Sequence, residues 1–259
     1  LNDFSKELNK HFDKNKCLAL DPRLHSIKEV NQIIELANKN ETKIHFTTPN
    51  LIDELWTDKP ERIYSAIFDH PINYAGIETS NKVDEFIQEL KNNHLNSYFL
   101  SSLDSIAWLL NLRGDDILHT PLAFAYLFIS VEYKPVLYVC IEKLNKDLKT
   151  RLNEFLTLEP IEKIDNIFNN LRKNLKIGFD YKNTSYFFYN LALENNHKPS
   201  NLQNPCLIPK AIKNDTELEG SREAHIRDGV SITKFLFWLK NHQSIETENE
   251  ISVANKLLS

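Results

Sequence analysis

Apolar positions in the first 70 residues follow two different spacings. Between residues 26 and 39 they recur every three or four positions, at Ile27, Val30, Ile34 and Ala37. Ser26 and Glu29 form a capping box at the start of this run, so the pattern predicts an amphipathic helix over 26–39. The short apolar stretches 17–20 and 43–47 predict strands on either side of it. We therefore expect a strand–helix–strand unit here.

Helical and strand spacing alternate again between residues 71 and 200. Apolar residues at helical spacing predict helices over about 83–90, from Pro160 to Leu175, and over 184–194. Apolar runs rich in β-formers predict strands at 98–100, 122–131, 136–141 and 177–181, the middle two joined as a hairpin. The apolar run 106–112 is expected to end in a turn at Gly114, because glycine adopts backbone angles that other residues resist. Together these elements predict one mixed α/β domain.

Two polar stretches that contain proline, 57–62 and 195–209, are the best linker candidates. After the second, Asn214 with Glu217 predicts the capped start of a long helix that ends near Asn241. Thr247 with Glu250 is expected to cap another helix. The helical pattern reaches the last residues and the sequence has no methionine, so we expect a portion of a longer protein.

The composition is that of a globular protein, with 41% hydrophobic and 26% charged residues among 259. Thirty-one basic and thirty-six acidic residues give a net charge of −5, so we expect no nucleic-acid partner. The uncharged run 121–131 is too short to cross a bilayer, and we expect no membrane partner. Three cysteines without a C-x-x-C pair, at 17, 140 and 206, indicate reduced, buried thiols. With no apolar secretory signal at the N-terminus, they favour a cytoplasmic location.

Few residues form patterns that point to chemistry. Phosphate-binding, zinc-protease and serine-hydrolase motifs are missing from the sequence. His225 shares a helical face with Arg222 and Asp228 and could contribute to a metal site, although an exposed polar network is the simpler interpretation.

A second group of polar residues lies close together in sequence: Asp104, Arg113, Asp115 and Asp116. These side chains could bind a polar ligand, but an arginine beside a turn more often donates to backbone carbonyls. His119 could act as a base or serve a structural role. Trp56 and Trp108 are interpreted as core or interface residues rather than as substrate platforms.

Three segments resemble a known enzyme family. They are residues 50–62 (NLIDELWTDKPER), 102–116 (SLDSIAWLLNLRGDD, with Pro121 and Tyr126 beyond it) and 210–230 (KAIKNDTELEGSREAHIRDGV). In this order they are similar to the cytosolic-type Xaa-Pro aminopeptidases of the creatinase superfamily. Ser221 stands where the family usually has methionine. The resemblance extends from about residue 15 to the end of the chain.

This resemblance implies an α/β fold with creatinase-type N-terminal domains, each a mixed sheet flanked by helices, followed by the opening helices of a pita-bread catalytic domain. Residues 1–70 would be the C-terminal half of a first N-terminal domain, 71–205 the second such domain, and 206–259 the truncated start of the metallopeptidase domain. These three ranges are the expected domains.

The resemblance also implies an activity. The complete enzyme would be a metallopeptidase that binds two metal ions, expected to be manganese, and hydrolyses the bond between an N-terminal residue and a following proline. The family's ligands, two Asp, one His and two Glu, would lie downstream, so we assign no catalytic, cofactor-binding or metal-binding residue in this chain and expect it to be inactive alone. Proline-containing peptides are the expected ligands of the complete enzyme, and a homodimer is left open. The alternative is a non-catalytic protein-binding module of the same architecture, as in the histone chaperone FACT.

Overall fold

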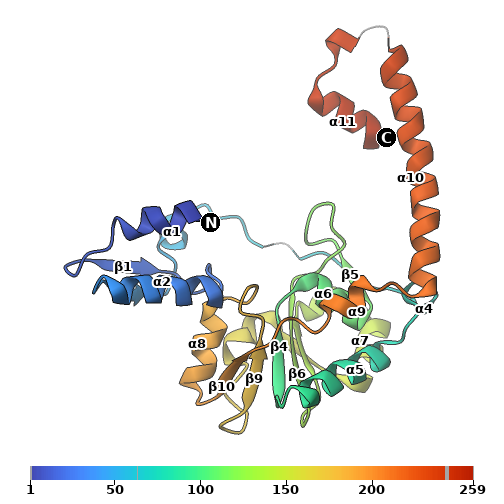
Figure 1. Cartoon of the computed structure of the whole chain (residues 1–259). Helices are drawn as coiled ribbons and strands as arrows, with labels where there is room; N and C mark the ends of the chain where they lie inside the picture. Colours follow the sequence, from blue (N-terminus) through green and yellow to red (C-terminus); the bar gives the residue numbers. More distant parts are fainter. Residues whose placement is uncertain (1, 63, 243–244, 259) are drawn as a thin grey trace. The chain divides into compact units, whose positions relative to one another are not determined.

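The structure is a computed structural model that describes residues 2–62, 64–242 and 245–258. The chain divides into two compact units (Figure 1). The first contains residues up to His70 together with Ile77–Ala211, and the second contains Pro71–Gly76 together with residues from Ile212 onward. Within the described ranges, no helix combines the length and apolarity that crossing a membrane requires.

The first unit begins with helix α1 (Asn2–Asn9) and the predicted strand–helix–strand element. Strands β1 (Cys17–Leu20) and β2 (Lys43–Phe46) pair in parallel, and helix α2 (Ile27–Lys39) connects them. Ser26 and Glu29 form the expected reciprocal capping box. Ile27 and Val30 are fully buried because α2 packs its apolar face against the larger sheet of this unit. A short helix, α3 (Leu51–Leu55), follows β2.

The larger sheet has six strands in the order β10-β9-β4-β6-β7-β8. The strands are β4 (Ser97–Leu100), β6 (Ala125–Ser130), β7 (Val136–Val139), β8 (Thr157–Pro160), β9 (Lys176–Phe179) and β10 (Lys198–Asn201). Strands β4, β6 and β7 are antiparallel neighbours, whereas β10 with β9, β9 with β4, and β7 with β8 are parallel. The predicted hairpin of β6 and β7 is therefore confirmed.

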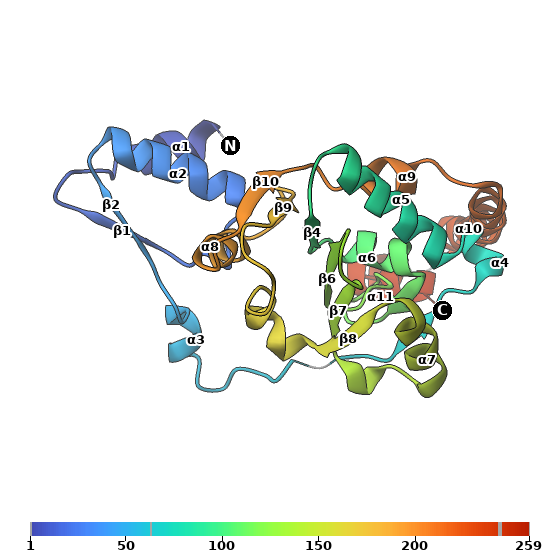
Figure 2. The ribbon, with the colours of Figure 1, turned by 90° about the horizontal axis from the view of Figure 1, so that it is seen from below.

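Helices cover both faces of this sheet (Figures 1 and 2). Helices α5 (Thr79–Asn92), α6 (Leu103–Leu110) and α7 (Lys146–Phe155) pack on one face, and α2 and α8 (Tyr186–Glu194) pack on the other. Alternation along β4 divides the two cores, with Tyr98 and Leu100 in one and Phe99 in the other. The expected fold class, a mixed sheet flanked by helices, is confirmed.

The second unit is helical. It consists of α4 (Ile72–Ala75), α10 (Asp215–Asn241), a short 3₁₀ turn at Ile245–Thr247 and α11 (Glu250–Leu258). Asn214 forms the predicted capping box with Glu217, and its side-chain amide also donates to the Ala75 carbonyl at 2.9 Å. Gly76 has φ +72°, and a Cβ there would lie 2.5 Å from the Asn214 Oδ1, so both backbone and packing require glycine.

Helix α10 buries none of its residues, although it carries several large apolar side chains. Ile226 and Phe237 are 69% and 71% exposed. The long, capped helix that the sequence predicts is confirmed, and its apolar side chains remain in contact with solvent.

Two predicted elements differ in the structure. The segment from Pro160 to Leu175 is not a regular α-helix: Pro160 ends β8, and Ile161–Asn166 form a 3₁₀ helix, η2, followed by turns. Its asparagines at 166, 169, 170 and 174 favour turns, and Asn174 has φ 63°.

Gly114 lies in strand β5 (Leu112–Gly114), which pairs with β3 (Ile67–Asp69), and not in a turn. A Cβ there would lie 2.8 Å from the Ala123 Cβ, so the glycine serves a close approach.

Three smaller expectations are corrected. The stretch 195–209 is not a plain linker, because it contains β10 at the sheet edge and the start of helix α9 (Leu207–Ala211). Helix α11 is preceded by Asn249, whose side chain accepts from the Ser252 backbone N–H, and not capped by Thr247. All three cysteines are free, but only Cys206 is buried; Cys140 is half-buried and Cys17 is exposed.

Candidate functional site

The polar residues between 104 and 116 do not converge on one site. Asp104 forms an ion pair with Lys210 of helix α9, which lies just before the second unit in the sequence. Asp116 accepts hydrogen bonds from the backbone N–H groups of Ser65 and Phe124, at 2.5 and 2.8 Å. Asp115 is exposed. Asp116 therefore ties backbone segments together and Asp104 pairs with a lysine, and these carboxylates do not form a pocket for a polar ligand.

Arg113 has the structural role that its position beside Gly114 suggested. Its guanidinium Nη1 donates to the carbonyls of Leu112 and Ala107, at 2.8 and 3.2 Å. Ala107 lies inside α6 and Leu112 begins β5, so one side chain joins the helix to the strand that follows it.

The other candidate residues from the sequence lie apart from one another. His119 is exposed in a tight turn with φ 60°. Trp56 follows α3 and is 46% exposed, which does not fit a core residue, whereas Trp108, within α6, is partly buried and packs against the core. The sequence-based interpretation therefore holds for Trp108 as a core residue.

The residues proposed for a metal site do not form one. His225 lies on the exposed surface of α10, where its Nδ1 is 2.7 Å from the Ser221 carbonyl oxygen. Arg222 pairs with Glu219 on the same helix. Across the parts of the chain that the structure describes, His, Cys, Asp and Glu side chains form no group of three that could hold a metal ion. These residues do not fit a two-metal centre.

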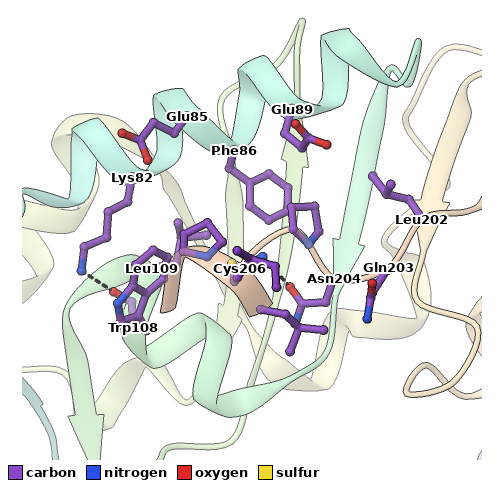
Figure 3. A pocket seen from close by; sticks show the side chains of 14 residues that line it. Lys82, Glu85, Phe86, Glu89, Trp108, Leu109, Leu202, Gln203, Asn204 and Cys206 are labelled. Carbon is purple, nitrogen blue, oxygen red and sulfur yellow. Dashed lines mark hydrogen bonds between the residues drawn. The ribbon is translucent and has the colours of Figure 1, made fainter. Parts of the chain in front are cut away.

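One hollow of the first unit lies elsewhere, between α5, α6 and the segment 202–209 (Figure 3). We call it the α5–α6 pocket; its volume is about 490 Å³, within the range of ligand pockets. Phe86 and Leu109 supply apolar side chains from the two helices, and the segment 202–209 adds Leu202 and Pro205. Glu85 and Glu89, also on α5, lie along one edge of the pocket.

Hydrogen bonds fix the wall formed by residues 202–209. The Tyr98 hydroxyl donates to the Leu202 carbonyl at 3.1 Å. The buried Asn204 side chain donates to Ser105 Oγ at 2.8 Å, and its own Oδ1 accepts from the Cys206 N–H at 3.0 Å. Because burial raises the pKa of Tyr98 far above its usual value, this hydroxyl remains a donor. The pocket is therefore held open by the fold itself.

Lys82 lies at one end of the pocket and is only 3% exposed. Its ammonium donates to the Trp108 carbonyl at 2.8 Å and to Asn111 Oδ1 at 2.7 Å, and lies 4.5 Å from the centre of the Trp108 ring. Asn111 ends α6 in the left-handed conformation and donates onward to the Ile77 carbonyl. The lysine thus donates hydrogen bonds to acceptors at the C-terminal end of α6 and presents mainly its carbon stem to the pocket.

Cys206 lies at the base of the pocket, 1% exposed. Burial raises the pKa of its thiol to about 12, so the group stays protonated at neutral pH. A protonated thiol is a poor nucleophile and a poor metal ligand. The chemistry available here is binding through apolar contact and through the Glu85 and Glu89 carboxylates.

Sequence reasoning did not single out this pocket. Lys82 was the available signal: a lysine four residues before Phe86 lies on the apolar face of α5, where a charge needs a buried partner. Asn204 was another signal: it lies between Pro199 and Pro205, in an irregular segment that hydrogen bonds from a buried amide can hold in place. Neither reveals a pocket until the segment 202–209 is folded back onto α5 and α6.

Comparison with known proteins assigns the fold to a family. The sequence model of the creatinase/prolidase N-terminal domain matches residues 58–217. The chain is 31% identical over 256 residues to a probable Xaa-Pro aminopeptidase P of Paracoccidioides lutzii, covering 93% of this chain and 41% of that protein. It is 32% identical over 252 residues to the corresponding protein of Talaromyces stipitatus, covering 93% of this chain and 38% of the relative. The chain thus spans about two fifths of the length of the curated relatives it matches.

Solved structures agree with this assignment. An X-prolyl aminopeptidase from Caenorhabditis elegans, described as a cytosolic enzyme with a di-nuclear active site, superposes with a TM-score of 0.88 at 25% identity. That match covers 98% of this chain and 42% of the worm enzyme. An Xaa-Pro dipeptidase from Bacillus anthracis, at 14% identity and a TM-score of 0.51, shares the fold. The chain belongs to the creatinase/prolidase N-terminal domain family, and its homologues are Xaa-Pro aminopeptidases.

Proposed function

We propose that these 259 residues form the non-catalytic N-terminal portion of a metal-dependent Xaa-Pro aminopeptidase. The observation that carries this proposal is the match to the worm enzyme, which extends over 98% of this chain at a TM-score of 0.88. In the complete enzyme this portion holds the catalytic domain in position and shapes access to it. The ligands are peptides whose second residue is proline.

The proposed domains are residues 1–70, 71–205 and 206–259. The family match at 58–217 supports an N-terminal domain of the creatinase type in the middle of the chain. Helix α10 supports a catalytic domain beyond it, because its exposed Ile226, Val230 and Phe237 offer an apolar surface that further polypeptide would cover.

The metal ions of the complete enzyme, which we take to be manganese, would activate water for peptide hydrolysis. Residues outside these 259 would hold them, in agreement with the exposed, unassembled positions of His225 and Asp228. A cytoplasmic location is supported by the three free cysteines and by the description of the worm enzyme as cytosolic. A homodimer is compatible with the apolar surface of α10.

The test compares this chain with the complete polypeptide read from its gene. Both are incubated with manganese and the peptide Arg-Pro-Pro, with Arg-Ala-Pro as the control substrate, and release of the first residue is measured. We expect release from Arg-Pro-Pro by the complete polypeptide and none above buffer by the 259-residue chain. Release by the chain alone would refute its non-catalytic role. A complete polypeptide that binds histones and cleaves neither peptide would favour the alternative, a protein-binding relative of the FACT type.

A further inference from the structure

The α5–α6 pocket has features of a binding site that no role in peptide hydrolysis explains. It is lined by elements of a single compact unit, and three hydrogen bonds that involve Tyr98 and Asn204 hold the segment 202–209 in place. A preformed pocket saves the ordering entropy that a flexible loop would lose on binding. It is therefore ready to accept a ligand without rearrangement.

The interior favours an apolar group. Phe86, Leu109 and Leu202 line it, and two further lining residues, Pro205 and Pro209, add rigid apolar surface. Ile208, at the rim, is 69% exposed. A volume of about 490 Å³ accommodates two or three amino-acid side chains, but not a folded domain.

The charged groups that remain at the rim are acidic. No hydrogen bond or ion pair joins the Glu85 carboxylate to another of the residues the structure describes, and Glu89 bonds only to the Asn93 amide, at 2.8 Å. The two lie four residues apart, so they share one face of α5. Both carboxylates can therefore accept a hydrogen bond from a cationic ligand.

The basic groups nearby do not cancel this acidity. The Lys82 ammonium is turned inward to the Trp108 carbonyl and Asn111, and Lys210 is paired with Asp104. An anionic ligand would be repelled by the two carboxylates, and neither Lys82 nor Lys210 is turned outward to bind it. Charge complementarity therefore selects a ligand with a positive charge beside an apolar group.

We propose that the α5–α6 pocket binds a short basic-apolar peptide segment of another protein. One apolar side chain enters between Phe86 and Leu202, and a lysine or arginine beside it pairs with Glu85 and Glu89. The segment lies along the rim formed by Pro205 and Ile208. This proposal concerns a partner protein and is independent of the proposed peptidase.

The test uses two peptides with blocked termini, acetyl-Gly-Leu-Lys-Leu-Lys-Gly-amide and its twin with both lysines replaced by glutamate. Each is titrated into the 259-residue chain by calorimetry at low salt. We expect saturable binding of the basic peptide that weakens as salt rises, and binding of the acidic twin weaker by about tenfold or more. Equal affinity for the two peptides would overturn the proposal.

Variants locate the site. Glu85→Gln with Glu89→Gln should weaken binding by about fivefold, as expected for two partly exposed ion pairs. Ile208→Lys should abolish it by placing a cation on the rim, whereas Leu24→Lys is the matched control, since Leu24 is also 69% exposed and lies outside the pocket. Thermal melts check that each variant is folded. Unchanged affinity of the Ile208 variant, or equal loss in the control, would refute the site.

A last arm tests the occupant. The same titration is repeated with the complete polypeptide, which should bind the basic peptide with the same affinity. If the complete polypeptide binds none while the 259-residue chain does, the pocket is covered by the protein's own chain and the partner proposal is wrong.

Discussion

Replacing Lys82 by methionine tests how the buried ammonium stabilises the first unit. The lysine is 3% exposed, and its ammonium donates hydrogen bonds to neutral acceptors, among them the Trp108 carbonyl and Asn111 Oδ1. Methionine keeps the length of the apolar stem but leaves both acceptors without this donor.

Two opposing energies decide the result. Hydrogen bonds from a charged donor contribute about 1.5–3 kcal/mol each, and an acceptor left buried and unsatisfied costs about 1–3 kcal/mol. Against this, methionine removes the desolvation penalty of a buried ion, which amounts to several kcal/mol. Because that penalty is already offset by two short hydrogen bonds and the Trp108 ring, we expect a net loss of about 2 kcal/mol in the free energy of unfolding.

The assay is urea unfolding of the 259-residue chain in which Trp56 and Trp238 are replaced by phenylalanine, so that Trp108 alone reports. With a slope of about 2 kcal/mol per molar urea, the Lys82→Met midpoint should fall by about 1 M. Lys91→Met, an exposed lysine on the same helix, is the control and should change the stability by about 0.5 kcal/mol or less. A Lys82→Met midpoint equal to or above that of the control would show that desolvation outweighs the hydrogen bonds.

Three further outcomes are expected. Burial lowers the pKa of His197 below its usual 6.5. As pH falls below 6.5, the unfolded chain takes up a proton before the folded chain does, so the free energy of unfolding decreases until the pH reaches the folded-state pKa. His197→Phe should flatten this pH dependence, measured by urea titrations from pH 7.5 to 5. Arg113→Lys loses the planar fork that reaches two carbonyls and should lower the melting temperature measured by circular dichroism, while an unchanged value would contradict the structural role. Ending the chain after Ala211 removes the exposed apolar side chains of α10 and should reduce self-association in light scattering; a monodisperse 259-residue monomer with no gain on truncation would contradict this.

Local elements could be predicted because their signals are local. The capping boxes at Ser26 and Asn214 fix where α2 and α10 begin, since each satisfies backbone donors within one turn. Strand β4 could be recognised as a buried strand because Tyr98, Phe99 and Leu100 form an uninterrupted apolar run. In these places the sequence specified the element and the core face it presents.

Long-range packing decided what local patterns could not. The apolar spacing from Pro160 to Leu175 fits a helix, yet the edge pairing of β8 and the asparagine-rich turns produce a 3₁₀ helix instead. Gly114 is a residue type typical of turns, but here it lets the Ala123 backbone and side chain pack close to strand β5. The pairing of β8 with β7 and the contact of Gly114 with Ala123 both lie outside the local window, whereas the asparagines are a local signal that the apolar spacing masked.

The candidate site shows the same division. Arg113 could be interpreted from its neighbours because the carbonyls it binds lie within six residues. The α5–α6 pocket brings Lys82 and Glu85 together with Trp108 and Asn204, and it forms only when the segment 202–209 folds back onto α5 and α6. The sequence by itself therefore determined the helices, strands and caps, whereas tertiary structure decided which distant side chains enclose a pocket, since that depends on non-local contacts.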